Sequence, residues 1–327
     1  MLSIHDIELT EENRVEIEHT NHSFREFEYL VTSHQVEVRE LVAKNPNLPD
    51  EYAQMMIKDV IVQVRVALAS NPNLSPVIVE KLAREEKTPV LISVARHPKL
   101  DMKMIELFAN HNTHAIRDAV ASNLATPVDI LKKLSTDTQW GVRRSVAGNL
   151  NATTEILSSL IDNGTHHELN AIGKNLNSTK EVLDKLFKRI TQSQERQLKS
   201  ILEDIIGHPN YPEKSARDIY EALLQEEKDK QAQENAGSEL SVAIDRKAVA
   251  SRIDLSSEFI NVLLQDPSEQ VRETLGANEL IPDEILSLLA LDSEESVRTA
   301  VYKNPKASAE TKATALLLGI EASTNDN

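Results

Sequence analysis

Aliphatic side chains recur along this chain with a period of 26 residues, which is longer than an ordinary single helix or strand. The period is easiest to follow from one polar position per repeat, here called the anchor. The anchors are Asn45, Asn71, His97, Asn123, Asn149 and Asn175, and further along Arg252, Asn278 and Asn304. A less regular repeat fits around His208, seven residues later than the period demands. Such a period predicts a stack of similar repeats, each contacting its neighbours.

Two further positions of the repeat are apolar in all nine aligned copies. Three residues before the anchor stand Val42, Leu68, Val94, Val120, Val146, Ile172, Val249, Leu275 and Val301. Eleven residues after it stand Met56, Leu82, Phe108, Leu134, Leu160, Leu186, Leu263, Leu289 and Ala315. About half of all residues in an average chain are apolar, so this agreement is not chance. These side chains form the predicted core.

Each repeat contains two runs of apolar residues at helical spacing. In one repeat Val64, Ala67 and Leu68 mark the second run. A hydroxyl residue followed by proline, as in Ser75-Pro76 and Thr126-Pro127, predicts the start of the first helix. Neither helix can bury its apolar face alone, so neighbouring repeats must stack. The sequence therefore predicts an all-α solenoid of about ten 26-residue repeats.

The anchor is followed by proline in several repeats, as at Asn45-Pro46, Asn71-Pro72 and Asn304-Pro305. Proline cannot continue a helix, and asparagine tolerates the left-handed backbone conformation that ends many helices. We therefore expect the anchor asparagines to end helices in that conformation. Repetition down a stack is typical of a structural role and disfavours a catalytic one.

Arginine and aspartate recur in step with the anchor, with arginine six residues before it and aspartate a further six residues before the arginine. This predicted ladder comprises Arg39, Asp59, Arg65, Arg117, Asp137, Arg143, Asp266, Arg272, Asp292 and Arg298, with Arg246 in the same position. Arginine and carboxylate form strong charge-assisted hydrogen bonds, so we expect pairing within a repeat and with the neighbouring repeat. An arginine row for phosphate or an acidic peptide is the alternative, and the recurring carboxylates disfavour it.

The pattern Asp59…Val64-Arg65…Leu68-Ala69-Ser70-Asn71-Pro72 resembles the leucine-rich repeat variant family, a relative of HEAT and armadillo repeats. The resemblance covers about residues 31–190 and 243–318. It implies a right-handed superhelix in which the second element of a repeat can be short or 3₁₀. Some members of the family carry a cysteine-bound iron–sulfur module, and this chain has no cysteine to hold one. The resemblance indicates a fold and carries little information about function.

Interruptions of the repeat predict five segments. They are an N-terminal helical cap (1–30), a regular repeat array (31–190), an irregular helical insertion and linker (191–242), C-terminal repeats (243–318) and a disordered tail (319–327). The cap offers Val15, Ile17, Phe24 and Phe27 to shield the first repeat. The charged stretch 225–238 is either a solvated helix extension with a loop or a hinge.

Composition narrows the functions further. The 52 acidic against 36 basic side chains give a net charge of −16, which opposes binding to nucleic acid and to anionic membranes. The absence of cysteine excludes disulfides and thiolate metal sites. The N-terminal residues lack the features of a signal peptide, and no apolar stretch reaches the length of a membrane span, so we expect a cytoplasmic protein. The histidine pairs 111/114 and 166/167 lack convergent further ligands, so we expect no metal and no cofactor.

One face of the second helix is left for binding. Positions nine, five and one before each anchor lie on one face of the second helix, turned away from the aliphatic core positions. The predicted binding stripe comprises Val62, Val66, Ile92, His114, Asp118, Trp140, Arg144 and Asn170. Aromatic and arginine side chains dominate binding hot spots, so Trp140 beside Arg144 predicts an anchor for a partner. The alternative is that Val66 and Ile92 belong to the core and that Trp140 fills a corner.

The favoured function is a non-enzymatic scaffold that binds a protein or peptide on its concave face, because stacked repeats present extended surfaces of this kind. Two alternatives come from other HEAT-like proteins. One is a DNA-glycosylase type of nucleic-acid enzyme, which would need a basic groove with aromatic side chains. The other is a lyase or cofactor-attachment protein, which would bind a chromophore or another small ligand. The sequence names no partner and no oligomeric state.

Overall fold

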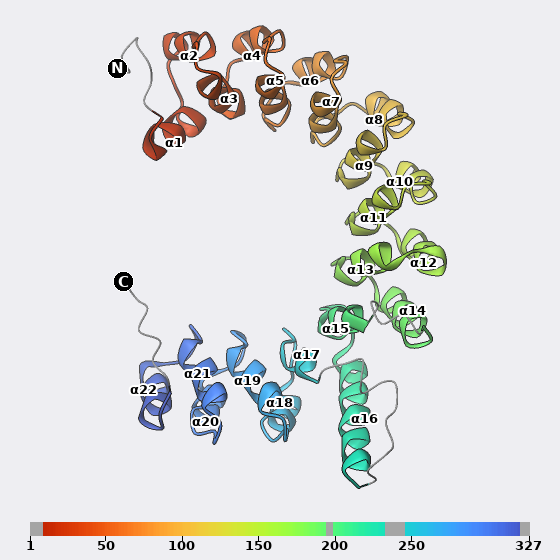
Figure 1. Ribbon diagram of the computed structural model, residues 1–327, viewed down its shortest axis with the longest axis vertical. Coiled ribbons are helices and arrows are strands. Elements are labelled where there is room, and N and C mark those ends of the chain that lie inside the picture. Colours follow the sequence, from red (N-terminus) through yellow and green to blue (C-terminus); the bar gives the residue numbers. More distant parts are fainter. Residues whose placement is uncertain (1–8, 194–198, 233–245, 321–327) are drawn as a thin grey trace. The chain divides into compact units, whose positions relative to one another are not determined.

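The computed structural model of the protein describes residues 9–193, 199–232 and 246–320. Within these residues the chain forms 22 α-helices, α1 to α22, with no strand and no 3₁₀ helix (Figure 1). The predicted all-α class is therefore confirmed, and both elements of the repeat are α-helical in these residues. The helices form two compact units, Met1–Ile156 and Leu157–Asn327. Their boundary falls within α12 (Thr154–Asn163), inside the segment expected to be one regular array.

The N-terminal unit has two layers of helices. Each odd-numbered helix packs against the odd-numbered helices before and after it, and these line the inner side of the curve within this unit (Figure 1). The odd-numbered helices are α1 (Glu11–His19), α3 (Val36–Lys44), α5 (Val62–Ala69), α7 (Thr88–Ala95), α9 (His114–Ser122) and α11 (Trp140–Gly148). The even-numbered helices are α2 (Phe24–Val31), α4 (Asp50–Met56), α6 (Pro76–Leu82), α8 (Met102–Ala109) and α10 (Val128–Leu134).

The C-terminal unit repeats the arrangement, with each odd-numbered helix packed on the next. Its odd-numbered helices are α13 (His166–Lys174), α15 (Lys199–Gly207), α17 (Lys247–Ala250), α19 (Glu269–Ala277) and α21 (Glu295–Lys303). Its even-numbered helices are α14 (Lys180–Thr191), α16 (Glu213–Ala232), α18 (Ser257–Leu263), α20 (Asp283–Leu289) and α22 (Ala309–Leu317). Neighbouring-helix contacts of this kind are those of a helical repeat protein.

The core consists of the aliphatic positions that define the period. All eighteen side chains three residues before and eleven residues after the nine aligned anchors are at most 4% exposed. Full burial of an aliphatic side chain contributes roughly 1.5–3 kcal/mol, so these positions supply a large share of the hydrophobic stabilisation. In the less regular repeat Ile205 fills the first of these positions, while Ile219 is only half-buried and its neighbour Tyr220 is buried.

The predicted caps are only partly present. The hydroxyl of Ser75 makes no capping hydrogen bond, although Pro76 does begin α6. Thr126 lies before the N-cap Pro127 and donates its hydroxyl to the Val120 carbonyl at 2.6 Å. Pro76 lies in the first turn of α6, which its fixed φ suits, whereas Pro127 is the extended N-cap residue before α10.

The anchor asparagines differ from the prediction in an instructive way. Their backbone is not left-handed: φ is −60° at Asn45 and −74° at Asn149. Instead, the side-chain amide of an anchor such as Asn71 donates to two backbone carbonyls of the preceding repeat. Asn71 reaches Ala43 O at 3.0 Å and Asn45 O at 2.8 Å, and its own Oδ1 accepts from the Asn73 amide at 3.0 Å. Equivalent bonds occur at Asn45, Asn123, Asn149, Asn278 and Asn304.

The anchors therefore connect consecutive repeats. The carbonyls at the end of a helix have no partner within that helix, and an amide 26 or 28 residues later satisfies them. Because buried polar groups are costly unless they are hydrogen-bonded, the anchor fixes the spacing of the stack as well as the end of the helix. We call this series of bonds the anchor ladder.

The N-terminal cap follows the same plan as the repeats. Helix α1 packs on α3, and the Asn45 amide donates to Ile17 O at 2.8 Å and Thr20 O at 2.9 Å. Ile17 and Phe27 are buried as expected of a cap, whereas Val15 and Phe24 are 57% and 56% exposed. The cap is thus a helix pair that resembles a repeat. Only one face of each of its two helices covers the first repeat.

The break in the repeat is packed in the part of it that the structure describes. Helix α15 buries Ile201 and Ile205, and the 20-residue helix α16 buries Tyr220. The Tyr220 hydroxyl donates to Asp266 Oδ2 at 2.7 Å, which ties α16 to the C-terminal repeats. Residues 194–198 and 233–245 of the predicted insertion and linker, and residues 321–327 of the predicted tail, lie outside the described residues.

Candidate functional site

The arginine ladder connects neighbouring repeats through ion pairs. Arg39, Arg117 and Arg272 each hold the carboxylate twenty residues later with both Nε and Nη2, at 2.6–3.2 Å. Arg246 holds Asp266 in the same way, at 3.2 and 3.0 Å, and Arg65 pairs with Glu85 through Nε at 2.8 Å. Bidentate pairs of this kind combine strength with fixed geometry.

Within a repeat the contact is not the predicted ion pair. Arg65 Nη1 meets the backbone carbonyl of Asp59 and not its carboxylate. Arg143, Arg272 and Arg298 meet the carbonyls of Asp137, Asp266 and Asp292 in the same way, each at 2.7 Å. The aspartate precedes the helix that carries the arginine, so its carbonyl faces the guanidinium while its carboxylate is left for the arginine one repeat earlier.

The paired arginines of the ladder have little positive charge left to attract a ligand. Burial would raise the pKa of the Asp137 carboxyl, but the hydrogen bonds from Arg117 and from the Gln139 amide lower it, and the charges of Arg117 and Arg143 lower it further. The pKa of Asp292 is lowered in the same way by Arg272. Carboxylates that stay ionised neutralise their arginines, which supports a structural reading of the ladder over a phosphate-binding row.

The predicted binding stripe is accessible. None of its eight residues is buried; His114, Trp140 and Arg144 are exposed, and Val62, Val66, Ile92, Asp118 and Asn170 are half-buried. Val66 and Ile92 are half-buried, whereas the buried positions on α5 and α7 include Leu68 and Val94. Asn170 lies in the C-terminal unit, and the other seven lie in the N-terminal unit.

Trp140 and Arg144 form a pair one turn apart on α11. The Arg144 guanidinium carbon lies 5.7 Å from the centre of the Trp140 ring, within cation–π range. The indole remains 45% exposed, so the pair offers a flat apolar surface edged by a positive charge. Trp140 does not fill a corner of the core.

Asp118 is engaged by both neighbouring odd-numbered helices. Its Oδ1 accepts a hydrogen bond from the Ser145 hydroxyl of α11. Its Oδ2 lies 4.0 Å from Arg96 Nη2, beyond the end of α7. Asp118 therefore holds the face together between α7 and α11 and limits its role in recognition.

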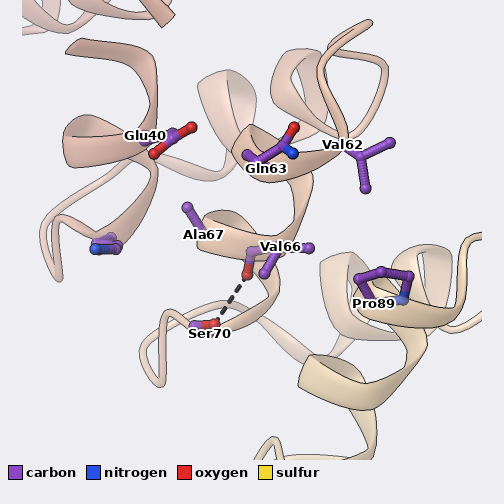
Figure 2. Close-up of a pocket in the computed structure, with 8 residues that line it drawn as sticks. Glu40, Val62, Gln63, Val66, Ala67, Ser70 and Pro89 are labelled. Atoms are coloured by element: carbon purple, nitrogen blue, oxygen red, sulfur yellow. Dashed lines mark hydrogen bonds between the residues drawn. The ribbon is translucent and has the colours of Figure 1, made fainter. Parts of the chain in front are cut away.

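A groove of about 400 Å³ opens on the same face of the N-terminal unit. Figure 2 shows that Glu40 comes from α3, Val62, Gln63, Val66, Ala67 and Ser70 come from α5 and its end, and Pro89 comes from α7; Lys44 of α3 completes the lining. Val62, Val66 and Pro89 supply the apolar side, and Glu40 and Lys44 supply one charge of each sign. Ser70 is turned back onto its own helix, with Oγ 2.9 Å from the Val66 carbonyl.

The groove joins two predicted stripe residues, Val62 and Val66, to residues that sequence reasoning missed. Gln63 and Ala67 stand eight and four residues before the anchor, beside the stripe on the same helix, whereas the C-cap Ser70 occupies the position one before the anchor, which belongs to the stripe. Pro89 occupies the equivalent of Gln63 one repeat later. Extending the stripe by one helical position on each side would have found them, because neighbouring odd-numbered helices lie side by side.

Other chemistry finds no support in the described residues. No group of three or more histidine, aspartate or glutamate side chains there is arranged to hold a metal ion. The His166 and His167 rings lie 3.8 Å apart on α13, against each other. None of the helices formed by residues 9–193, 199–232 and 246–320 combines the length and the apolar character needed to cross a membrane.

Comparison with known proteins adds little. No protein-family model matches the sequence, and no curated protein matches it. A solved structure described as that of an engineered protein from a structural genomics consortium aligns with 90% of this chain and 98% of its own, at 14% sequence identity and a TM-score of 0.32. A likeness this slight supports no argument about fold or function.

Proposed function

We propose that this protein is a non-enzymatic α-solenoid scaffold of about ten repeats, built as a right-handed superhelix, whose odd-helix face in the N-terminal unit binds a protein or peptide. The observation that carries the proposal is the groove at Val62, Val66 and Pro89, which shares this face with the exposed pair Trp140 and Arg144. Stacked repeats use such extended faces for recognition. We also propose a relationship to the leucine-rich repeat variant family.

The chemistry of the face indicates what kind of segment it would bind. The groove is open and partly apolar, which suits an aliphatic or aromatic side chain. Arg144 keeps its guanidinium at the surface beside the indole, where it can pair with a carboxylate of the partner. The partner is therefore a segment with an apolar side chain and an acidic residue. A net charge of −16 favours a protein partner over nucleic acid.

Affinity capture from the cells that express the protein tests the proposal with three variants. Trp140→Ala with Arg144→Glu removes the exposed pair, and Val66→Asp places a charge in the groove. Val128→Asp is the matched control, because Val128 is 45% exposed like Trp140 but lies on even-numbered α10. Each variant is first shown to have the circular dichroism of the wild type.

We expect one specific partner to be captured by the wild type and by the control Val128→Asp. The two variants on the odd-numbered helices, Trp140→Ala with Arg144→Glu and Val66→Asp, should both lose it. A partner list that is the same for the wild type and both of these variants would overturn the proposal. Retention of a chromophore or another small ligand by the purified wild type would favour the cofactor-attachment alternative.

A further inference from the structure

Two anchors of the ladder are histidines, His97 in the N-terminal unit and His208 in the C-terminal unit. His97 Nε2 lies 2.9 Å from the Asn71 carbonyl, and His208 Nε2 lies 2.9 Å from the Asn175 carbonyl. In each case Nδ1 lies 3.1 Å from the backbone amide two residues later, that of Lys99 or Asn210. Each imidazole thus takes the place of an asparagine carboxamide. Its Nε2 contacts the preceding repeat, and its Nδ1 contacts the turn that follows the histidine.

These contacts fix the protonation state of both rings. A carbonyl can only accept, so Nε2 must carry a proton, and a backbone amide can only donate, so Nδ1 must be bare. Both rings are therefore neutral and of the Nε2–H tautomer. The cation would place an Nδ1 proton against the amide proton of Lys99 or Asn210, and that hydrogen bond would be lost.

We propose that His97 and His208 are pH-sensitive joints of the array, one in each compact unit, at which protonation releases the turn that follows the anchor, because the Lys99 or Asn210 amide loses its acceptor while the Nε2 bond to the preceding repeat is kept. The asparagine anchors make the corresponding bonds without a titratable group. Acidification therefore loosens the turns after His97 and His208 and leaves the turns after the asparagine anchors intact.

The surroundings of His97 disfavour the cation. The side chain is 3% exposed, and burial lowers its pKa, against the bond to Asn71, while the charge of Lys99 lowers it further. On the helices packed against α7, Arg65 and Arg117 are already paired with Glu85 and Asp137. Arg96, the neighbour of His97 in the chain, is exposed and lies near Asp118.

His208 is in a comparable position. It is 4% exposed, and burial lowers its pKa, against the bond to Asn175, with a further contribution from the charge of Arg252. Arg252 is itself buried and donates to the Ile206 carbonyl, two residues before His208. Beside α15, Lys174 pairs with Asp204 at 3.8 Å. In the described residues no hydrogen bond joins a carboxylate to the ring of His97 or His208, so the bond to the Asn71 or Asn175 carbonyl is the contact that favours the imidazolium.

The sign of the pH effect follows from the lowered pKa values. An unfolded histidine takes up a proton near pH 6.5, whereas the folded rings stay neutral to lower pH. The stability that the neutral rings contribute is thus complete above about pH 6.5 and is lost as the pH falls from there towards the folded pKa values. Below those values both states are protonated, and the loss is complete.

Nuclear magnetic resonance of the full chain with ¹⁵N-labelled histidine tests the proposal directly. The expected spectrum shows His97 and His208 as Nε2–H tautomers that titrate at lower pH than the exposed His34. Amide exchange at Lys99 and Asn210 should lose protection as the respective ring takes up its proton, after correction for the intrinsic rate. In His97→Asn and His208→Asn the respective amide should stay protected, while His34→Asn should behave as the wild type.

Either of two results would overturn the proposal: an Nδ1–H tautomer at these rings, or titration at the same pH as His34. Protection of Lys99 and Asn210 that is unchanged in the wild type after the rings have titrated would do the same. The titration of His97 and His208 in the wild type tests the proposal even if an asparagine variant fails to fold.

Discussion

The side-chain amide of Asn123 donates a hydrogen bond of 3.1 Å to the backbone carbonyl of His97, the anchor of the preceding repeat. It donates a second of 2.8 Å to Ala95 O, and its Oδ1 accepts from the Ala125 amide at 2.8 Å. The side chain is 5% exposed, so water cannot replace these bonds readily. The period of the sequence thus has a direct physical cause: an amide placed once per repeat meets the same carbonyls every time.

Replacing Asn123 with alanine tests this cause. The substitution leaves buried carbonyls and an amide without their partner, and each such group costs about 1–3 kcal/mol. We expect the free energy of unfolding, measured in urea, to fall by on the order of 3 kcal/mol. Asn112→Ala, at an exposed position, should change it by less than about 0.5 kcal/mol. Equal effects of the two substitutions would contradict the role of the anchor.

The Arg117–Asp137 ion pair should contribute measurably to stability. Its side chains are only 16% and 8% exposed, and its two bonds measure 2.6 and 2.9 Å. A double-mutant cycle with Arg117→Ala and Asp137→Ala should give a coupling energy of about 1–3 kcal/mol. The exposed pair Lys132–Glu155 is the comparison, and its coupling should stay below about 1 kcal/mol. A coupling at Arg117–Asp137 no larger than at the exposed pair would contradict the prediction.

The same ion pair predicts a dependence on acid. The folded pKa of Asp137 lies below its ordinary value, so its contribution is complete above the unfolded pKa of about 3.9 and is lost as the pH falls through the folded pKa. Urea denaturation of the wild type and of Asp137→Asn between pH 6 and pH 2.5 measures this. The two curves should converge towards the acid end, and parallel curves would contradict the assignment.

Tyr220 offers a test of the packed break. Its hydroxyl bonds to Asp266, which is 2% exposed, and burial followed by that bond raises the pKa of the phenol. Tyr220→Phe should lower the free energy of unfolding of the C-terminal unit by about 1–2 kcal/mol. Tyr302→Phe, at a half-buried position, is the control. Hydrogen exchange in α16 reports the effect locally; unchanged exchange there would indicate that the helix is not held by this bond.

The sequence predicted the core and the two-helix repeat well because both depend on spacing alone. Leu68 and Leu82 were aligned because apolar residues recur at their positions in every repeat, and both are buried. Apolar residues that recur at a fixed spacing fall on the buried face of each repeat. The backbone conformation of the anchors was predicted wrongly. An Asn-Pro pair is compatible with several helix endings, and only three-dimensional stacking shows that the side chain of Asn71 reaches Ala43 and Asn45.

The candidate site was predicted less completely. The stripe of Val62, Val66 and Trp140 followed from the helical face, but the groove needs Pro89 from the next repeat, and the separation of the helices is not encoded in any single repeat. The aspartate contacts were divided differently from the prediction, because Asp59 offers its carbonyl to Arg65 and its carboxylate to Arg39. Such choices depend on side-chain direction at the turn, which residue spacing does not give.

The 26-residue repeats are joined by the anchor ladder. If they are interchangeable, one whole repeat can be removed without breaking the ladder. Deleting residues 46–71 removes one repeat and joins Asn45 to Pro72, which restores the sequence Asn-Pro-Asn-Leu present at both positions. His97 then follows Asn45 by one period, and Arg39 stands twenty residues before Glu85, so the ladders remain continuous.

Circular dichroism of this deletion during urea unfolding, beside a half-repeat deletion of residues 46–58, is the most direct measurement. We expect the full-repeat deletion to keep the helical signal per residue and to unfold cooperatively. The half-repeat deletion should lose helix, because the anchor side chains no longer meet the carbonyls of the preceding repeat. Equal loss of helical signal in the two deletions would contradict this expectation.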